Sequence, residues 1–499
     1  MITAGQIAVD QPSERGDLVF AVLRAGQFTG EVNLLSGRRA LARARVTVAG
    51  EVIALDREQL LALVQTDAEL GEIILRAFIL RRVELIAQGR GDAVLLGSNH
   101  CAATLRVKEF LTRNGHPYAY IDLDRDADVQ HLLDRFQITA ADVPVLICRG
   151  ELVLRRPTSQ EIADCLGFNA AIDATQVRDL VIAGAGPAGL AAAVYAASEG
   201  LDVLVLESNA PGGQAGSSSR IENYLGFPTG VSGQELTGRA YAQAQKFGAE
   251  VMIAQGAARL TCGGEPYGIE ISGGGRVPTR AVIIATGAAY RRLPIENLAR
   301  FEGAGIYYAA TFMEAQLCAG EEVVVVGGGN SAGQAAVFLA QSDARVHMLV
   351  RSNGLAQSTS RYLIRRIEEH PAIVLRTHTQ LSALAGDGHV ESVSWREDRT
   401  GSTETHAIRH CFLMTGADPN TGWLDGCVAR DAKGFVRTGP DVTPTTSVRR
   451  TGRWRSPPVC SKRVSRGCSR WVMSARGGSN GSPPLSARDP SQSLSCIRR

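Results

Sequence analysis

Two glycine-rich turns, at residues 184–189 and 327–332, constrain this chain more than any other feature. Each follows a short apolar segment and precedes a second one, and their glycines stand in G-x-G-x-x-G and G-x-G-x-x-A spacing. Glycine allows the tight turn and lets the backbone approach a pyrophosphate, whose charge is stabilised by the positive end of the following helix. The two turns therefore predict two β-α-β dinucleotide-binding units in an α/β fold.

The first unit contains every part of the dinucleotide-binding pattern. Asp179 to Ala183 is an apolar strand, an alanine-rich helix follows the turn, and the strand Val203 to Leu206 ends at Glu207. An acid at this place accepts hydrogen bonds from the ribose hydroxyls of an adenosine. The predicted ligands of the adenosine diphosphate are Gly184, Gly186, Pro187, Ala188, Gly189 and Glu207.

The second unit differs at the end of its second strand. Val323 to Val326 leads into the turn, and the strand Arg345 to Val350 is followed by Arg351 instead of an acid. A cation at this place suits the 2′-phosphate of NADP, and the alternative is a solvated surface arginine. The predicted ligands are Gly327, Gly329, Asn330, Ser331, Ala332 and Arg351.

The remaining composition fits a globular protein of about three domains. The 53 basic and 50 acidic side chains nearly cancel at +3, so we expect neither a nucleic acid nor a membrane as partner. Residues 1–11 have no basic leader and no apolar stretch, which makes the cytoplasm the default compartment. The ten cysteines include no Cys-x-x-Cys pair and no zinc-like spacing, so we expect no metal site.

Three further motifs follow the first turn in order: Pro211-Gly-Gly-Gln214, Ile221-Glu-Asn-Tyr-Leu-Gly-Phe-Pro228 and Ala285-Thr-Gly287. With the turn, they resemble the low-molecular-weight thioredoxin reductases up to about residue 440. The resemblance implies FAD and NADPH as cofactors and hydride transfer from NADPH to the flavin. It implies a Rossmann-like FAD domain at 178–290 and 411–442 and a Rossmann-like NADPH domain at 291–410. The residues implied to line the FAD site are Gly213, Gln214, Asn223, Thr286 and Gly287.

One part of the reductase pattern is missing. The family carries a Cys-x-x-Cys pair just ahead of the second glycine turn, and this chain has Tyr308-Ala-Ala-Thr-Phe312 there. Ala309 and Phe312 occupy the cysteine positions, which excludes a dithiol relay. We expect Cys318, six residues beyond Phe312, to be a buried structural thiol. The electron acceptor stays open among ferredoxin, a quinone, oxygen and a disulfide, whether a small molecule or a small redox protein.

Residues 91–168 alternate strands and helices and form a predicted small α/β domain. Asn99-His-Cys-Ala-Ala-Thr104 opens a helix after a strand, and Val143-Pro144 precedes another strand. These features resemble the thioredoxin or glutaredoxin fold, which implies a cis Val143–Pro144 bond and a thiolate-favouring place for Cys101 at a helix N-terminus. Cys101 is therefore the candidate catalytic thiol, of monothiol type because Thr104 stands at the resolving position. The alternative is a docking domain in which Cys101 is incidental.

Residues 1–90 contain Gly26-Gln-Phe-Thr-Gly-Glu-Val-Asn-Leu-Leu-Ser-Gly-Arg-Arg39, which resembles the phosphate-binding cassette of cyclic nucleotide-binding domains. Gly30 and Glu31 match the cassette, but Arg38 and Arg39 come too early for its phosphate-binding arginine. Few residues precede the cassette, so we expect an incomplete β-barrel, with a vestigial or regulatory role favoured over a working sensor.

The last segment, 443–499, is rich in Ser, Arg, Pro and Gly and is predicted to be disordered. The codons for residues 467–476, read in a shifted frame, permit Val-Phe-Ala-Val-Gly-Asp-Val-Arg-Ala. That peptide resembles the Gly-Asp strand end that the reductase family has near its C-terminus. We therefore hypothesise a single-base insertion or deletion near Thr443 or Pro444.

Together these features predict an FAD- and NADPH-dependent oxidoreductase of the thioredoxin reductase type. Two alternatives stay open: a non-catalytic, nucleotide-responsive interaction protein, and an inactive product of a damaged gene. A homodimer is left open as the state of assembly.

Overall fold

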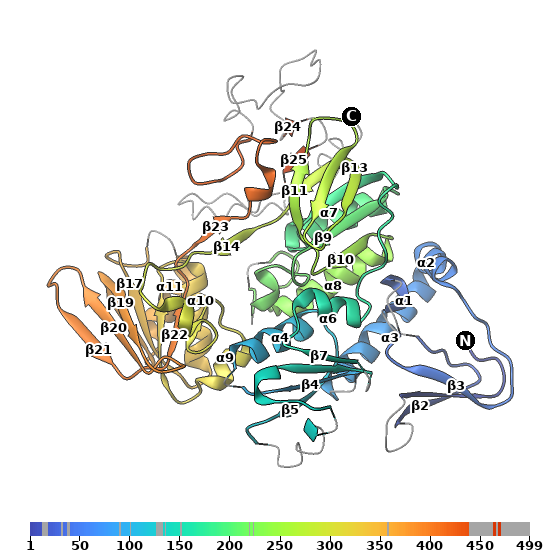
Figure 1. Cartoon of the computed structure of the whole chain (residues 1–499), viewed down its shortest axis with the longest axis horizontal. Coiled ribbons are helices and arrows are strands. Elements are labelled where there is room, and N and C mark those ends of the chain that lie inside the picture. Colours follow the sequence, from blue (N-terminus) through green and yellow to red (C-terminus); the bar gives the residue numbers. More distant parts are fainter. Residues whose placement is uncertain are drawn as a thin grey trace.

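A computed structural model describes residues 1–11, 18–30, 33–36, 40–88, 91–99, 101–125, 133–134, 136–149, 152–218, 220–222, 224–356, 359–438, 463–465 and 468–470. Figure 1 shows the two glycine-turn units side by side, joined by the pair β14 (Ala288–Tyr290) and β23 (Ala417–Pro419). The two N-terminal regions lie against the first unit.

The first glycine turn belongs to a mixed sheet. Its elements are β8 (Arg178–Ala183), α7 (Pro187–Ser198), β9 (Val203–Glu207), α8 (Gly233–Lys246), β10 (Glu250–Ile253), β11 (Ala257–Thr261), β12 (Tyr267–Ile271) and β13 (Arg276–Ile284). The strand order is β10-β9-β8-β13-β12-β11, with parallel pairing from β10 to β13 and antiparallel pairing beyond it. Strands β8 and β9 are buried almost throughout, as parallel strands covered on both faces are.

The second glycine turn belongs to a parallel sheet of order β15-β22-β16-β17-β18. The elements are β15 (Ile306–Tyr307), α9 (Phe312–Leu317), β16 (Glu322–Val326), α10 (Asn330–Gln341), β17 (Arg345–Val350), α11 (Arg361–Glu369), β18 (Ile373–Thr377) and β22 (His410–Leu413). A three-stranded antiparallel sheet adjoins it: β19 (Thr379–Ala385), β20 (Ser392–Glu397) and β21 (Thr403–His406).

The predicted return to the first unit at residue 411 is too early. Strand β22 pairs with β16 in the second sheet, so the chain crosses back only at β23. The apolar run of β22 reads alike in either sheet, and only the pairing decides which sheet it joins.

Residues 93–165 form a four-stranded sheet of order β5-β4-β6-β7. The elements are β4 (Ala93–Gly97), α4 (Ala102–Arg113), β5 (Ala119–Asp122), β6 (Val145–Cys148), β7 (Leu152–Arg155) and α6 (Ser159–Cys165). Strands β4 and β5 are parallel, whereas β4–β6 and β6–β7 are antiparallel. The predicted cis Val143–Pro144 bond is confirmed. The thioredoxin-like assignment itself stays a prediction.

The N-terminal region forms an antiparallel sheet of order β2-β1-β3 and a helical segment. The bounds are β1 (Gln6–Gln11), β2 (Leu18–Arg24), α1 (Asn33–Ser36), β3 (Arg43–Val48), α2 (Arg57–Thr66) and α3 (Ala68–Ala87). Arg81 on α3 donates to the carbonyls of Phe28 and Gly30, which ties the cassette-like turn to this helix. Glu31, Arg38 and Arg39 lie outside the described residues, so nucleotide binding here stays untested.

Part of the tail departs from the predicted disorder. Strands β24 (Arg463–Ser465) and β25 (Cys468–Arg470) pair with each other, and β25 lies parallel to β13 in the first sheet. The parallel register joins Val282 to Cys468 and Ile284 to Arg470. The remaining residues after 438 lie outside the described part of the chain. None of the described helices is long and apolar enough to cross a bilayer.

Candidate functional site

A cavity of about 2210 Å³ lies where the first glycine turn, helix α4 and the segment 302–317 meet. Pockets for small ligands usually measure roughly 300–1,000 Å³, so this one has room for a dinucleotide and more. Several predicted FAD ligands line it: Gly184, Gly186, Pro187, Ala188, Glu207, Gly213, Gln214, Thr286 and Gly287. The structure thus brings together residues that are far apart in the sequence.

The first turn is closely packed. Gly184 has φ +103°, and a Cβ on Gly189 would lie 1.9 Å from the Gly184 carbonyl oxygen. Gly186 caps α7 without a side-chain hydrogen bond, and Pro187 occupies its first turn. The amide groups at this helix end are therefore free to receive an anion. Gly189 itself does not line the cavity, and its role is the close packing of helix on strand.

Glu207 lies at the end of β9, as predicted, and is 7% exposed. Its two carboxylate oxygens accept hydrogen bonds from the backbone amides of Ala185 (2.8 Å) and Asn209 (2.9 Å). Burial raises the pKa of Glu207, and these two amides oppose that rise. The carboxylate thus joins the end of β9 to the chain segments of Ala185 and Asn209.

The loops implied to surround the flavin are held by their own hydrogen bonds. The Gln214 side chain donates to the carbonyl of Ala288 (2.6 Å), and the Thr286 hydroxyl donates to the carbonyl of Asn420 (2.7 Å). Gly213 and Gly287 have φ of +52° and +59°, a region that favours glycine. Asn223 lies outside the described residues.

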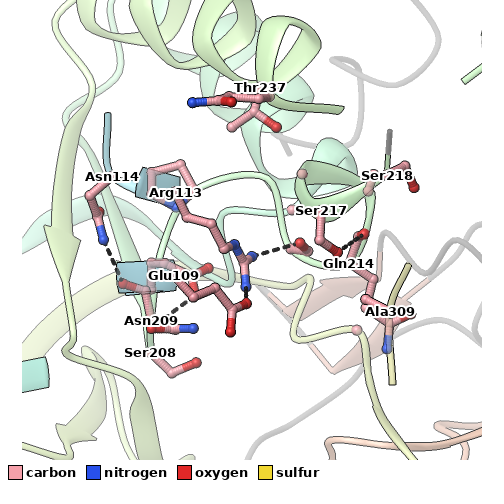
Figure 2. A pocket seen from close by; sticks show the side chains of 18 of the residues that line it. Glu109, Arg113, Asn114, Ser208, Asn209, Gln214, Ser217, Ser218, Thr237 and Ala309 are labelled. Carbon is pink, nitrogen blue, oxygen red and sulfur yellow. Dashed lines mark hydrogen bonds and ion pairs between the residues drawn. The ribbon is translucent and has the colours of Figure 1, made fainter. Parts of the chain in front are cut away.

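Helix α4 forms a wall of this cavity that sequence reasoning missed. Figure 2 shows Arg113 and Glu109 beside the loop of Asn209 and Gln214. Arg113 Nη2 donates to the carbonyl of Gly213 (2.7 Å), and the Asn114 amide donates to the carbonyl of Asn209 (3.4 Å). Nothing in the sequence indicated that Arg113, which belongs to a separate α/β region, would contact the first unit.

The second turn has a local geometry similar to that of the first, but it lies outside the lining of the large cavity. Gly327 has φ +145°, and a Cβ there would lie 2.4 Å from the carbonyl oxygen of Met414. Gly329 caps α10, and the Asn330 side chain accepts a hydrogen bond from the amide of Ser360 (2.7 Å). Ala332 is fully buried and Ser331 is exposed. Among the described residues that line the large cavity, none comes from this turn.

Arg351 follows β17 directly and is exposed, at the same end of the sheet as the turn. Arg361, the first residue of α11, is also exposed, whereas His347 is partly buried and faces Glu322. Arg351 is therefore free to meet a phosphate from solvent.

The cavity wall also contains the position of the missing thiols. Ala309 lines the cavity beside the Tyr290–Tyr308 pair, whose stacked rings are 5.9 Å apart. Cys318 is fully buried, and burial raises its pKa to about 12, which fits the predicted structural thiol. Burial also raises the pKa of Cys411. Neither thiol is suited to form a thiolate near neutral pH.

Cys101 caps the N-terminus of α4 and is partly buried. Burial alone raises its pKa, but hydrogen bonds from Thr104 and Ala103 and the charge of Arg106 give a net lowering. The adjacent Ala102 lines the cavity, and a Cβ on Gly303 would lie 2.9 Å from the Ala102 Cβ. Cys101 itself is not among the residues that line the cavity; it is Ala102 that lies beside the segment leading to Tyr308.

Two disulfides were not foreseen in the sequence. Cys148 pairs with Cys165 across 17 residues, and Cys262 pairs with Cys427 across 165 residues. Such separations carry no local spacing signal, because the pairs form only when the chain has folded. Neither pair lines the large cavity.

The fold and the site define a protein with two dinucleotide-binding units and, beside the first glycine turn, a cavity large enough for a dinucleotide. The chain belongs to the pyridine nucleotide-disulphide oxidoreductase family, whose model matches residues 178–448. It is accordingly an NAD(P)H-dependent flavin oxidoreductase that uses FAD and NADPH.

Relatives within this family are thioredoxin reductases. The chain is 34% identical over 265 residues to a thioredoxin reductase of Treponema pallidum (strain Nichols), covering 53% of this chain and 84% of that protein. It is 30% identical over 316 residues to an NADPH-dependent thioredoxin reductase 3 of Arabidopsis thaliana, covering 60% of this chain and 59% of that one. The solved thioredoxin reductase of T. acidophilum shares the fold, with a TM-score of 0.52, 23% identity and coverage of 64% of this chain and 95% of that chain.

Proposed function

We propose that this chain oxidises NADPH through FAD and delivers the electron pair to a disulfide, without an internal Cys-x-x-Cys pair. The observation that carries the proposal is the large cavity. Flavin-loop residues such as Gln214 and Thr286 face the segment Tyr307–Thr311 across it, with Ala309 where a cysteine is expected. When bound, FAD accepts hydride from NADPH and returns two electrons to the acceptor.

Several residues support FAD in this place. The N-terminus of α7 has no side-chain cap, so its amide groups can bind a diphosphate, and Glu207, the predicted ribose ligand, lines the same cavity. Arg113 also lines the cavity, and its side chain is 17% exposed. Its positive charge favours an anionic ligand there.

We further propose Cys101 as the thiol that presents the acceptor. A disulfide between Cys101 and a small thiol, or a small redox protein, would be cleaved by two electrons and two protons to give two thiols. The support is the place of Cys101 on α4, one residue from Ala102 at the cavity wall. The thioredoxin-like character of residues 91–168 and the cytoplasmic location remain part of this proposal.

The test of turnover is the absorption spectrum of the purified protein before and after anaerobic NADPH. We expect a flavin band that bleaches with NADPH and returns on addition of a disulfide of a small thiol. A flavin band that NADPH leaves unchanged would favour a non-catalytic, nucleotide-responsive protein instead.

Alkylation tests the role of Cys101. Because its pKa is below the usual 9.0, iodoacetamide should modify Cys101 at near-neutral pH, with a rate that falls as pH drops through that lowered pKa. Cys318 and Cys411 should stay unmodified in the folded protein, as mass spectrometry of the peptides would show. Equal modification of all three thiols would contradict the assignment.

We also propose that residues 443–499 result from a shifted reading frame. Strand β25 lies beside β13, and the shifted reading of the same codons gives an apolar strand that ends in Gly-Asp. Resequencing the DNA tests this: an intact frame, together with tail peptides as written in mass spectra, would overturn the idea.

A further inference from the structure

Arg113, the last residue of α4, crosses from the small α/β region into the first dinucleotide-binding unit. Its side chain is 17% exposed, and its Nη2 atom donates to the carbonyl of Gly213 at 2.7 Å. Nη1 lies 3.3 Å from Glu109 on the same helix (Figure 2), and Nε is buried with no hydrogen-bond partner in the described residues. The Arg113 side chain also lines the large cavity, so a ligand there can contact the accessible part of the guanidinium.

The carbonyl that Arg113 holds belongs to a residue packed against the end of α7. A Cβ on Gly213 would lie 3.1 Å from the Cα of Gly186, the N-cap of that helix. The guanidinium therefore lies close to the helix end that offers its amide groups to an anion. A fixed cation and a helix N-terminus at one place favour a diphosphate group.

The positive charge of Arg113 also acts on two residues that line the cavity, Glu207 and Tyr290. Burial raises the pKa values of Glu207 and Tyr290, and Arg113 opposes the rise at both. Glu207 is at the predicted ribose position, and Tyr290 lies in β14, just after the flavin-loop residue Gly287. Arg113 is thus close enough to act electrostatically on both of these residues of the cavity wall.

We propose that Arg113 is a ligand of the FAD diphosphate, supplied by the appended α/β region rather than by the Rossmann-like unit. This inference rests on the proposed use of FAD by this site. Because Arg113 links the two regions, FAD binding and the docking of α4 stabilise each other by the same factor. The appended region then has a cofactor-binding role that does not depend on Cys101.

The experiment is a titration of the full-length apoprotein with FAD, followed by quenching of flavin fluorescence. Arg113→Gln should weaken FAD binding about tenfold or more, since hydrogen bonds between charged partners are the strong ones. Arg113→Lys should recover part of the affinity. Arg125→Gln is the matched control, because it removes the same charge from the same α/β region at an exposed position that does not line the cavity, and it should change the affinity less than about threefold.

Binding of riboflavin shows whether Arg113 contacts the diphosphate of FAD or only stabilises the protein around it. Loss of a diphosphate contact weakens binding of FAD but leaves binding of riboflavin, which has no phosphate, unchanged. Disorder of the Gly213 loop weakens both. Limited proteolysis gives a second readout: FAD should protect the connection at residues 169–177 in the wild type and less in Arg113→Gln.

The outcomes are distinct. Wild-type affinity for FAD in Arg113→Gln, equal losses in Arg113→Gln and Arg125→Gln, or a parallel loss of riboflavin binding would each overturn the inference. If the wild type itself bound no FAD, the proposed function would fail first and the inference with it. Selective loss of FAD binding in Arg113→Gln supports both.

Discussion

The two glycine turns share one sequence pattern but not one structural setting. At the third position the first turn has Gly189, where a Cβ would lie 1.9 Å from a backbone oxygen, and the second has the fully buried Ala332. The first turn lines a cavity of about 2210 Å³ that also contains residues of α4, and the second contributes nothing to it. Similar motifs can therefore occupy different settings: the first turn borders a large cavity, and no residue of the second turn lines that cavity.

Gly189→Ala should have the largest effect. The added methyl group forces α7 away from β8, and overpacking of this kind costs about 1–3 kcal/mol or more. We expect a lower melting temperature of the apoprotein and loss of most bound flavin, measured by thermal unfolding and by absorbance. An unchanged flavin content would show that the first turn has as much space as the second.

Arg351→Glu tests whether the predicted site at the second turn distinguishes NADPH from NADH by the 2′-phosphate. Repulsion of that phosphate should raise the KM for NADPH roughly 10- to 100-fold relative to NADH, about 1.4–2.7 kcal/mol. Stability should not change because Arg351 is exposed. Steady-state kinetics with both nucleotides provides the measurement, and equal changes for NADPH and NADH would leave Arg351 without a role in selection.

Glu207→Gln tests the contribution of the carboxylate that lines the large cavity in the first unit. An amide has one oxygen to accept from the amides of Ala185 and Asn209, so we expect a loss of about 1 kcal/mol in the free energy of unfolding. Since the folded pKa of Glu207 is raised, its contribution is fully present below the unfolded value of 4.5 and declines as pH rises through the folded pKa. Denaturant unfolding of both proteins across pH should show their difference shrinking as pH increases; a difference that grows would contradict the raised pKa.

Ala332→Gly should have the smallest effect. It restores the G-x-G-x-x-G spacing in the second turn and removes one methyl group from a helix, which costs about 0.5–1 kcal/mol. NADPH affinity should stay within about twofold of the wild type, as isothermal titration would show. A loss as large as that of Gly189→Ala would mean that the two turns are packed alike.

Much of the dinucleotide framework could be predicted because it is local. The strands before and after each turn, the place of Glu207 after β9 and that of Arg351 after β17 follow from a few adjacent residues. For the same reason, the helix predicted to open within residues 99–104 is found as α4 (Ala102–Arg113). The sheet membership of β22 was not predictable, because an apolar run does not specify its neighbours.

The sequence by itself determined the two β-α-β units, their cofactor class and the absence of a thiol pair at Ala309 and Phe312, since glycine spacing and residue identity act over short distances. Tertiary structure decided which turn borders the large cavity, which carbonyl Arg113 contacts and how the four disulfide cysteines pair. These features depend on contacts between segments that are distant along the chain. They arise from packing and long-range hydrogen bonds, which no local pattern encodes.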